Sequence, residues 1–246
     1  MYNIASAKKI VRKRGYRSLF TAILVRKLGF GYLFVPFAAK KLAREKDSVR
    51  SVKDTIDFAF GFDYLGISMK PIQVRSEITK LLGLLQKKRP KSILEIGTAN
   101  GGTLFLFAKS SDRNAKIVSL DYDYAKWRGT LYKSFVLPSQ KLYLLTSDSH
   151  AAATLDRIKG ILGGEQVDFL FIDGDHSYEG VKKDFEMYSK LVRKGGMIGF
   201  HDIAVHPSKE ESEVNLFYDE IKKGYKSLEI IENRKQGWGG IGILYK

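Results

Sequence analysis

The sequence predicts an α/β fold in which helices cover both faces of a mostly parallel sheet of seven strands. Three observations support this prediction. Short apolar runs recur from residue 92 onward, segments of helical length separate most of them, and a glycine-rich turn follows the first run. Strands that alternate with helices in this way form right-handed crossover units, which make neighbouring strands parallel.

The expected strands are the apolar runs at residues 92–96, 116–120, 142–145, 167–172, 197–200, 228–231 and 241–245. A helix is expected before the first strand, where Val74, Ile78, Leu81, Leu82 and Leu85 form an apolar stripe with helical spacing. Only the polar, glycine-rich stretch 233–240 separates the last two strands. Since this stretch is too short for a crossover helix, these strands should form a C-terminal antiparallel hairpin.

The composition limits the class of protein. The chain has 246 residues, of which 44% are hydrophobic and 28% charged, as is typical of a globular protein that can bury a full core. It contains no cysteine, which excludes disulfides, thiolate metal ligands and a thiol nucleophile and makes the cytoplasm the expected compartment. The longest apolar run, residues 28–39, is too short to span a membrane, and Arg26 and Lys27 interrupt the N-terminal apolar stretch, which argues against a secretory signal.

Positive charge concentrates in residues 1–50. This segment holds 13 of the 42 Lys and Arg residues but only two acids, Glu45 and Asp47, while the net charge of the whole chain is +15. Its apolar and basic residues have spacings that suit one or two amphipathic helices, the second of them ended or kinked by Pro36. We therefore expect a basic helical N-terminal appendage at residues 1–50, a linker or lid segment at 51–70 and the main domain at 71–246.

Three contacts would explain the basic appendage. One is packing, either as a cap on the main domain or against a second copy in a homo-oligomer. Another is peripheral contact of residues 1–45 with an anionic membrane, which would place a cytoplasmic protein at the membrane surface. Contact with nucleic acid is the least favoured. The aromatic stretch 58–66 also has two interpretations, a lid over a substrate or packing beneath the sheet.

The first strand runs into the turn Glu95-Ile96-Gly97-Thr98-Ala99-Asn100-Gly101-Gly102-Thr103. A glycine turn lets a ligand approach the backbone, and the N–H groups that open the next helix favour an anionic group. The spacing of Gly97 and Gly101 is G-x-x-x-G, whereas a dinucleotide site has G-x-G-x-x-G. The Glu95 carboxylate is placed to meet an ammonium group or an ordered water.

Carboxylates also end the next two strands. Asp121 follows the second strand, where an acid can accept both hydroxyls of a ribose, and Asp148 follows the third, where it could accept an exocyclic amine with support from Ser147. Taken alone, each acid is at least as well explained as a helix N-cap or a turn residue. Together they occupy the carboxyl edge of the sheet, where α/β folds bind ligands.

Asp173 ends the fourth strand, and His201 and Asp202 end the fifth, so two carboxylates and an imidazole meet at this edge. Hard divalent ions such as Mg²⁺ prefer carboxylates, and an imidazole shifts the preference towards Mn²⁺ or Fe²⁺. The alternative is that both acids cap turns and His201 makes a structural hydrogen bond. His176 could act as a general base on a hydroxyl acidified by the cation, or merely order its turn.

Residues 92–202 resemble the core of a class I S-adenosylmethionine-dependent methyltransferase, which is a Rossmann-like fold. The runs Phe171-Ile172-Asp173-Gly174-Asp175-His176-Ser177-Tyr178-Glu179-Gly180-Val181, Leu191-Val192-Arg193-Lys194-Gly195-Gly196 and Phe200-His201-Asp202-Ile203 closely resemble the subgroup related to cephalosporin hydroxylase and macrolide sugar O-methyltransferases. The resemblance extends over about residues 71–246 and leaves residues 1–50 outside it.

This resemblance implies a set of site residues. Glu95, Gly97 and Gly101 would hold the methionine end of S-adenosylmethionine, together with Thr98 and Asn100 of the same turn. Asp121 would hold the ribose hydroxyls and Asp148 the adenine. Similar Mg²⁺-dependent O-methyltransferases place acidic or amide ligands at the positions of Asp173, His201 and Asp202, so His201 departs from that pattern. The catechol-type relatives carry a lysine base at the position of His176.

The predicted function is therefore an S-adenosylmethionine-dependent O-methyltransferase, assisted by Mg²⁺ or Mn²⁺, that acts on a sugar or another small polyhydroxylated acceptor. Asp173 and His176 would be its catalytic residues. Two other enzymes remain as alternatives, a non-haem-metal hydroxylase on the same fold and an RNA methyltransferase that uses the basic N-terminal segment. A binding module with a relic cofactor site is the least favoured alternative.

Overall fold

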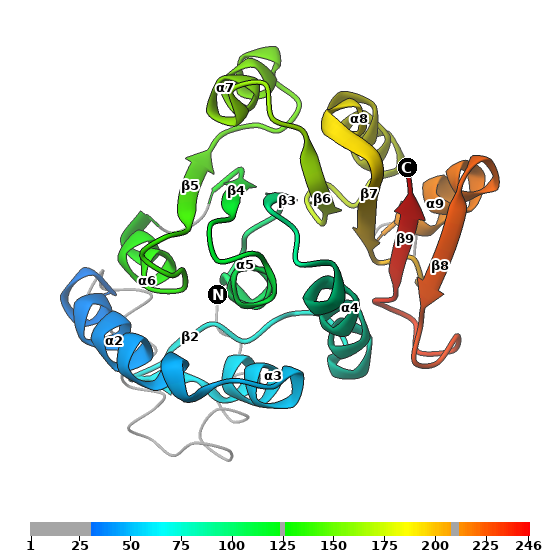
Figure 1. Ribbon diagram of the computed structural model, residues 1–246. Coiled ribbons are helices and arrows are strands. Elements are labelled where there is room, and N and C mark those ends of the chain that lie inside the picture. The colour runs from blue at the N-terminus through cyan, green and yellow to red at the C-terminus, as the bar shows by residue number, and fades with distance from the viewer. Residues whose placement is uncertain (1–30, 124–125, 208–211) are drawn as a thin grey trace.

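The computed structural model describes residues 31–123, 126–207 and 212–246. Its central feature is a seven-stranded sheet with the strand order β5-β4-β3-β6-β7-β9-β8 (Figure 1). The strands are β3 (Ser92–Ile96), β4 (Lys116–Asp121), β5 (Lys141–Thr146), β6 (Val167–Ile172), β7 (Val192–His201), β8 (Lys226–Ile230) and β9 (Ile241–Tyr245). The predicted fold class is confirmed, and the ends of four strands differ from the predicted ones.

The five strands from β5 to β7 are parallel, and β9 lies antiparallel between β7 and β8. The predicted C-terminal hairpin is therefore confirmed. The chain enters the sheet at its centre with β3 and adds β4 and β5 towards one edge. It then crosses back and adds β6 on the other side of β3. This reversal between β3 and β6 is the point where open α/β sheets bind their ligands.

Two helical layers enclose the sheet (Figure 1). The first layer contains α2 (Gly31–Glu45), α3 (Val52–Gly61), α4 (Arg75–Lys88), α5 (Gly102–Ser110) and α6 (Gly129–Lys133), and the second contains α7 (Ala152–Leu162), α8 (Tyr178–Tyr188) and α9 (Val214–Ile221). Side chains that alternate along a strand point to opposite layers. In β3, for example, Ile93 joins the core beneath the first layer and Leu94 the core beneath the second.

The segment that precedes the main domain is built into the first layer. Helix α2 buries Val35, Ala38, Ala39 and Leu42 and continues past Pro36, which therefore does not end it. The rest of the predicted appendage, residues 1–30, lies outside the described residues. No helix in the described ranges is long and apolar enough to cross a membrane.

Residues 51–70 contain elements that the sequence analysis does not predict. Helix α3 begins at a capping box, in which the Ser51 hydroxyl accepts from the Asp54 N–H and the Asp54 carboxylate accepts from the Ser51 N–H. The short strands β1 (Asp63–Tyr64) and β2 (Ile67–Ser68) then form a hairpin. The Phe58 ring packs 5.6 Å from the Phe105 ring of α5, so this aromatic stretch contributes to packing beneath the sheet.

The turn after β3 brings two backbone segments into direct contact. Gly97 has a φ of +96°, and a Cβ atom at this position would lie 1.9 Å from the carbonyl oxygen of Asp173. The Asp173 N–H donates to the Ile96 carbonyl oxygen over 2.8 Å, which joins the ends of β3 and β6. Only glycine fits this turn, because any side chain would force the two strand ends apart.

We predict that Gly97→Ala lowers the free energy of unfolding by about 3 kcal/mol or more, since it combines an unfavourable φ with a backbone clash. Urea denaturation measures this change. Gly83→Ala is the matched control, because Gly83 lies inside α4 with no atom within 4 Å of an added Cβ. The control should stabilise the protein by about 0.5–1 kcal/mol, and equal stability of Gly97→Ala and the wild type would contradict the argument.

Candidate functional site

Two cavities at the carboxyl edge of the sheet share one wall. The β4–β5 cavity, about 460 Å³, lies over the ends of β4 and β5, and the β6–β7 cavity, about 330 Å³, lies over the ends of β6 and β7. Gly97, Ala99 and Asp173 line both. Both volumes are in the range of small-molecule sites. A molecule in one cavity would therefore lie next to a molecule in the other.

Asp121 holds the glycine turn against the end of β4. Its Oδ2 atom accepts from the backbone N–H groups of Thr98, over 2.9 Å, and Ala99, over 2.8 Å, and its Oδ1 atom accepts from the Asp123 N–H. Asp121 also lines the β4–β5 cavity. The Asp121 carboxylate therefore fixes the shape of the glycine turn. It lies in the cavity where a ribose contact is predicted, and that contact stays a prediction.

Asp148 lines the same cavity as Asp121, which brings the two predicted cofactor acids together. Its Oδ1 atom accepts from the His150 N–H over 2.8 Å, as in an Asx turn. The neighbouring Ser147 hydroxyl shares a hydrogen bond with the Thr154 hydroxyl of α7 over 2.6 Å. Local hydrogen bonds therefore position this rim of the cavity.

Glu95 lies beneath the turn, not in a cavity wall. Its side chain is fully buried and accepts a hydrogen bond from the Ser119 hydroxyl, which is also 2.6 Å from the Thr98 hydroxyl. Burial raises the pKa of Glu95 to about 7, although hydrogen bonds from Ser119 and Thr103 oppose the rise. The structure thus gives Glu95 a supporting position, and its predicted contact with a methionine end stays a prediction.

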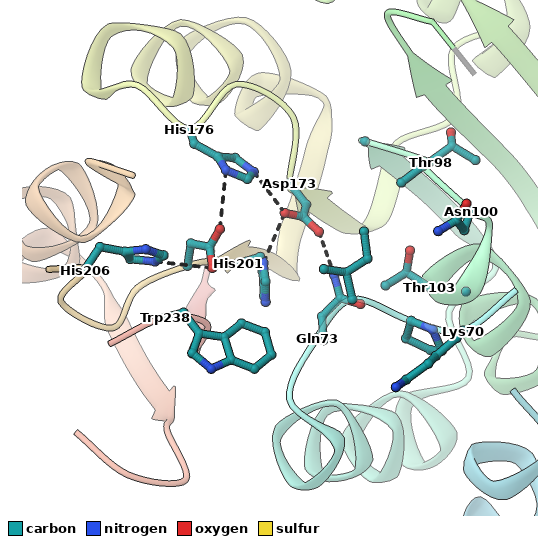
Figure 2. Close-up of a pocket in the computed structure, with 16 residues that line it drawn as sticks. Lys70, Gln73, Thr98, Asn100, Thr103, Asp173, His176, His201, His206 and Trp238 are labelled. Atoms are coloured by element: carbon teal, nitrogen blue, oxygen red, sulfur yellow. Dashed lines mark hydrogen bonds and ion pairs between the residues drawn. The ribbon is translucent and has the colours of Figure 1, made fainter. Parts of the chain in front are cut away.

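The remaining turn residues have different positions relative to the two cavities. Thr98 and Asn100 line the β6–β7 cavity (Figure 2). Gly101 has a φ of +80° and caps α5, and a Cβ there would lie 2.5 Å from the Tyr132 ring. The turn therefore offers its backbone and small side chains to both cavities, and Gly101 provides close packing behind it.

Asp173, His201 and Asp202 form a cluster at the base of the β6–β7 cavity (Figure 2). Each offers one ligand atom, and these atoms lie within 4.8 Å of one another. The His201 Nδ1 atom is 3.2 Å from the nearer Asp173 oxygen and 3.4 Å from the nearer Asp202 oxygen. The structure thus brings together the three residues predicted as metal ligands.

The two carboxylates of this cluster raise the pKa of His201, and His201 in turn lowers theirs. Burial lowers the pKa of His201, but the charge of Asp173 and hydrogen bonds to Asp173 and Asp202 outweigh burial and raise it to about 10. Burial raises the pKa of Asp202, yet the hydrogen bond with His201 and its charge lower it to about 2. The charge of His201 likewise keeps the pKa of Asp173 below its usual range. With no cation present, His201 is therefore an imidazolium between two carboxylates.

His176 bridges the same two carboxylates from the rim. Its Nε2 atom is 3.5 Å from an Asp173 oxygen, and its Nδ1 atom is 3.5 Å from an Asp202 oxygen. The hydrogen bond to Asp173 is the main reason that the pKa of His176 is raised. Because the ring is partly exposed and lines the cavity, it can exchange a proton with a bound molecule.

Three further residues of the β6–β7 cavity were not predicted from the sequence. The Gln73 side chain donates to the Asp173 Oδ2 atom over 2.7 Å, and its own Oε1 atom is buried without a partner. His206 lies with its Nε2 atom 3.5 Å from an Asp202 oxygen, and Trp238 lines the cavity from the β8–β9 loop (Figure 2). No sequence motif marks Gln73 or Trp238, because only the fold brings them to Asp173 and Asp202.

Glu77 fixes the loop that carries Trp238. This buried carboxylate of α4 accepts from the Glu232 N–H over 2.9 Å, the Gln236 side chain over 2.8 Å and the Gly240 N–H over 2.8 Å. Within the same loop, the Gly239 N–H donates to the Asp202 Oδ1 atom over 3.0 Å. Glu77 therefore positions one wall of the cavity and, through that loop, a hydrogen bond to Asp202.

Residues 94–203 match the family model described as a methyltransferase domain. This part of the chain is therefore similar to a methyltransferase domain. The matched range contains the glycine turn, Asp121, Asp148 and the Asp173, His201 and Asp202 cluster. That similarity and the seven-stranded sheet agree with the resemblance predicted from the sequence.

One curated relative is an uncharacterized protein of Acanthamoeba polyphaga mimivirus, 32% identical over 120 residues, which are 47% of this chain and 53% of the relative. The match thus spans about half the length of that relative. Among solved structures, the O-methyltransferase TomG from Streptomyces achromogenes, in complex with SAM, is 18% identical with a TM-score of 0.53 and covers 80% of this chain and 92% of its own.

An O-methyltransferase from Bacillus cereus in complex with SAH is 20% identical, with a TM-score of 0.50, and covers 72% of this chain and 84% of its own. Identities this low establish the fold of the methyltransferase domain. The hydroxylase and RNA methyltransferase alternatives gain no support from these matches. The narrower resemblance to cephalosporin hydroxylase and macrolide sugar O-methyltransferases stays a prediction.

We predict that Glu77→Gln lowers the free energy of unfolding by about 1–3 kcal/mol, because an amide group replaces a buried carboxylate that accepts from three donors. Urea denaturation measures the loss, and acrylamide quenching should show greater exposure of Trp238. Glu232→Gln is the control, since Glu232 is exposed in the same loop and only its backbone contacts Glu77. Unchanged stability and quenching in Glu77→Gln would contradict the positioning role.

The raised pKa of Glu95 predicts a pH dependence of stability. The folded protein keeps a proton that the unfolded chain releases near its ordinary pKa of 4.5, so stability falls as pH rises through about 7. Between pH 5 and pH 8 the wild type should lose about 2–3 kcal/mol more than Glu95→Gln, which does not ionise. Urea denaturation at both pH values tests this, with the exposed Glu186→Gln as control, and equal losses in wild type and Glu95→Gln would refute it.

Proposed function

We propose that the protein is an S-adenosylmethionine-dependent O-methyltransferase, assisted by Mg²⁺ or Mn²⁺, that methylates a sugar or another small polyhydroxylated acceptor. The observation that carries the proposal is the wall of Gly97, Ala99 and Asp173 shared by the two cavities. Methyl transfer needs a donor and an acceptor oxygen held in line and close together, and positioning of this kind supplies much of the rate gain.

The β4–β5 cavity suits the methyl donor. Asp121 and Asp148 face it from the ends of adjacent strands and offer carboxylate oxygens to the hydroxyl and amine groups of a nucleoside. The narrow turn at Gly97 gives a bound molecule access to the backbone between this cavity and its neighbour. The SAM and SAH in the similar O-methyltransferase structures support this assignment.

The residues of the β6–β7 cavity fit a divalent cation. Ligand atoms about 2.1 Å from an octahedral ion are about 3–4 Å apart, and those of Asp173, His201 and Asp202 lie within 4.8 Å of one another. His201 also has a buried Nε2 atom without a hydrogen-bond partner. Two carboxylates and an imidazole are a donor set that Mg²⁺ and especially Mn²⁺ accept.

When bound, S-adenosylmethionine supplies an electrophilic methyl group, and a divalent ion lowers the pKa of an acceptor hydroxyl. The side chains of this protein supply orientation and proton transfer. Gln73 holds the Asp173 carboxylate in place. His176, with its exposed edge in the cavity, takes the proton from the acceptor hydroxyl. Because both carboxylates favour its protonated form, His176 must first release a proton, which neutralisation of Asp173 and Asp202 by a cation favours.

The lining of the β6–β7 cavity suits a small polyhydroxylated ring. Trp238 offers an aromatic surface for the C–H face of a sugar, while the polar side chains of Gln73, Asn100 and Thr103 can meet its hydroxyl groups. Lys70 adds a cation at the same wall (Figure 2). These features support an acceptor with several oxygens.

Calorimetric titration separates the two parts of the proposal. We expect S-adenosylmethionine to bind with a dissociation constant in the micromolar range and at least tenfold more weakly to Asp148→Ala, which removes a polar contact in the β4–β5 cavity. Mn²⁺ binding should disappear in Asp173→Asn, whereas the cofactor should still bind that variant.

Asp156→Ala, an exposed acid on α7, is the control for both titrations. Failure of S-adenosylmethionine to bind the wild type at any metal concentration would refute the methyltransferase. Cofactor binding without Mn²⁺ or Mg²⁺ binding would refute only the metal assistance.

A further inference from the structure

The outward face of α2, formed by Tyr32, Leu33, Phe37, Lys40 and Arg44, combines exposed apolar and basic side chains. Tyr32, Leu33 and Phe37 are 63%, 57% and 56% exposed, and exposed apolar residues that lie together indicate an interaction site more strongly than single ones do. We infer that this face binds the surface of an anionic membrane. The inference does not depend on the proposed function.

The opposite face of α2 is already used. Val35, Ala38 and Leu42 are buried in the core, and the helix packs against α6 and the turn at residues 126–128. At its start, a Cβ on Gly31 would lie 2.6 Å from the Trp127 ring, so the helix is held closely to the domain. The outward face is therefore presented on a fixed helix, and its apolar residues are not needed for that packing.

Spacing places the outward residues on one stripe. Leu33, Phe37, Lys40 and Arg44 follow one another by four, three and four positions, so they lie along one side of the helix. The first two are apolar and the last two cationic. Such a stripe allows the apolar side chains at one end to enter the acyl boundary while the cations at the other end meet lipid phosphates.

A hollow beside this stripe adds one further cation, Lys41, and the aromatic ring of Tyr64. It is lined by Phe37, Lys40, Lys41, Arg44, Glu45 and Tyr64. Glu45 forms an ion pair with Lys41, which leaves the local charge positive through Lys40 and Arg44. Cations and aromatic residues together characterise a membrane–water interface, where phosphates and apolar chains lie within a few ångströms of each other.

Charge favours a membrane over the other partners of this face. The sequence that leads into α2, residues 1–30, holds eight Lys and Arg residues and no acid. A second copy would bring the same positive charges together, which opposes association. Nucleic acid would satisfy the cations but not the aliphatic Leu33. An anionic bilayer satisfies both the cations and the exposed apolar side chains.

Vesicle flotation of the full chain in 150 mM salt tests the inference. We expect the wild type to float with vesicles of phosphatidylcholine and phosphatidylserine and to remain unbound with phosphatidylcholine alone. The double variants Leu33→Asp/Phe37→Asp and Lys40→Glu/Arg44→Glu should each bind the anionic vesicles at least tenfold more weakly. Circular dichroism and the Tm should match the wild type, because the changed side chains are exposed.

Matched controls substitute exposed side chains of the same kind at positions outside α2. Leu216→Asp alters an exposed apolar side chain on α9, and Lys223→Glu/Lys235→Glu reverses two exposed charges, so both should float as the wild type does. Wild-type flotation of both α2 variants, or no flotation of the wild type, would overturn the inference. So would a dimer in light scattering that the α2 variants dissociate, or RNA binding at the same salt that they abolish while flotation persists.

Discussion

The contact between Gly97 and the Asp173 carbonyl is the constraint on which the rest of the site depends. Because Gly97 has no side chain and the Asp173 N–H donates to the Ile96 carbonyl oxygen, the ends of β3 and β6 approach each other directly. This approach makes a thin wall between two cavities that lie over different strand pairs. If the proposed function is correct, methyl donor and acceptor are held next to each other on the two sides of this wall.

Opposite charges organise the cavity on the β6–β7 side of that wall. Asp173 and Asp202 lie on either side of His201, whose pKa their charges and hydrogen bonds raise to about 10, so an imidazolium compensates part of their charge even without a cation. Neutral groups then fix the geometry, since the Gln73 amide donates to Asp173 and the Gly239 N–H donates to Asp202. Glu77 connects this arrangement to α4 through the β8–β9 loop.

Features that a local sequence pattern marks were predictable, whereas contacts between residues that only the fold brings together were not. Strand periodicity and the glycine turn predicted the sheet and placed Asp121, Asp148 and Asp173 at one edge, because parallel strands end together. Gln73 and Glu77 contact residues 100 and 163 positions away, for which the sequence carries no local signal. Helix α3 is a different case, since Ser51 and Asp54 form a recognisable capping box before it.

The most direct test of this account is a crystal structure of the protein with S-adenosylhomocysteine and Mn²⁺, recorded with the anomalous signal of manganese. We expect the nucleoside in the β4–β5 cavity beside Asp121 and Asp148, and an anomalous peak among Asp173, His201 and Asp202 on the other side of Gly97. A nucleoside bound elsewhere, or one whose sulfur is turned away from the β6–β7 cavity, would contradict the claim that the two cavities bring donor and acceptor together.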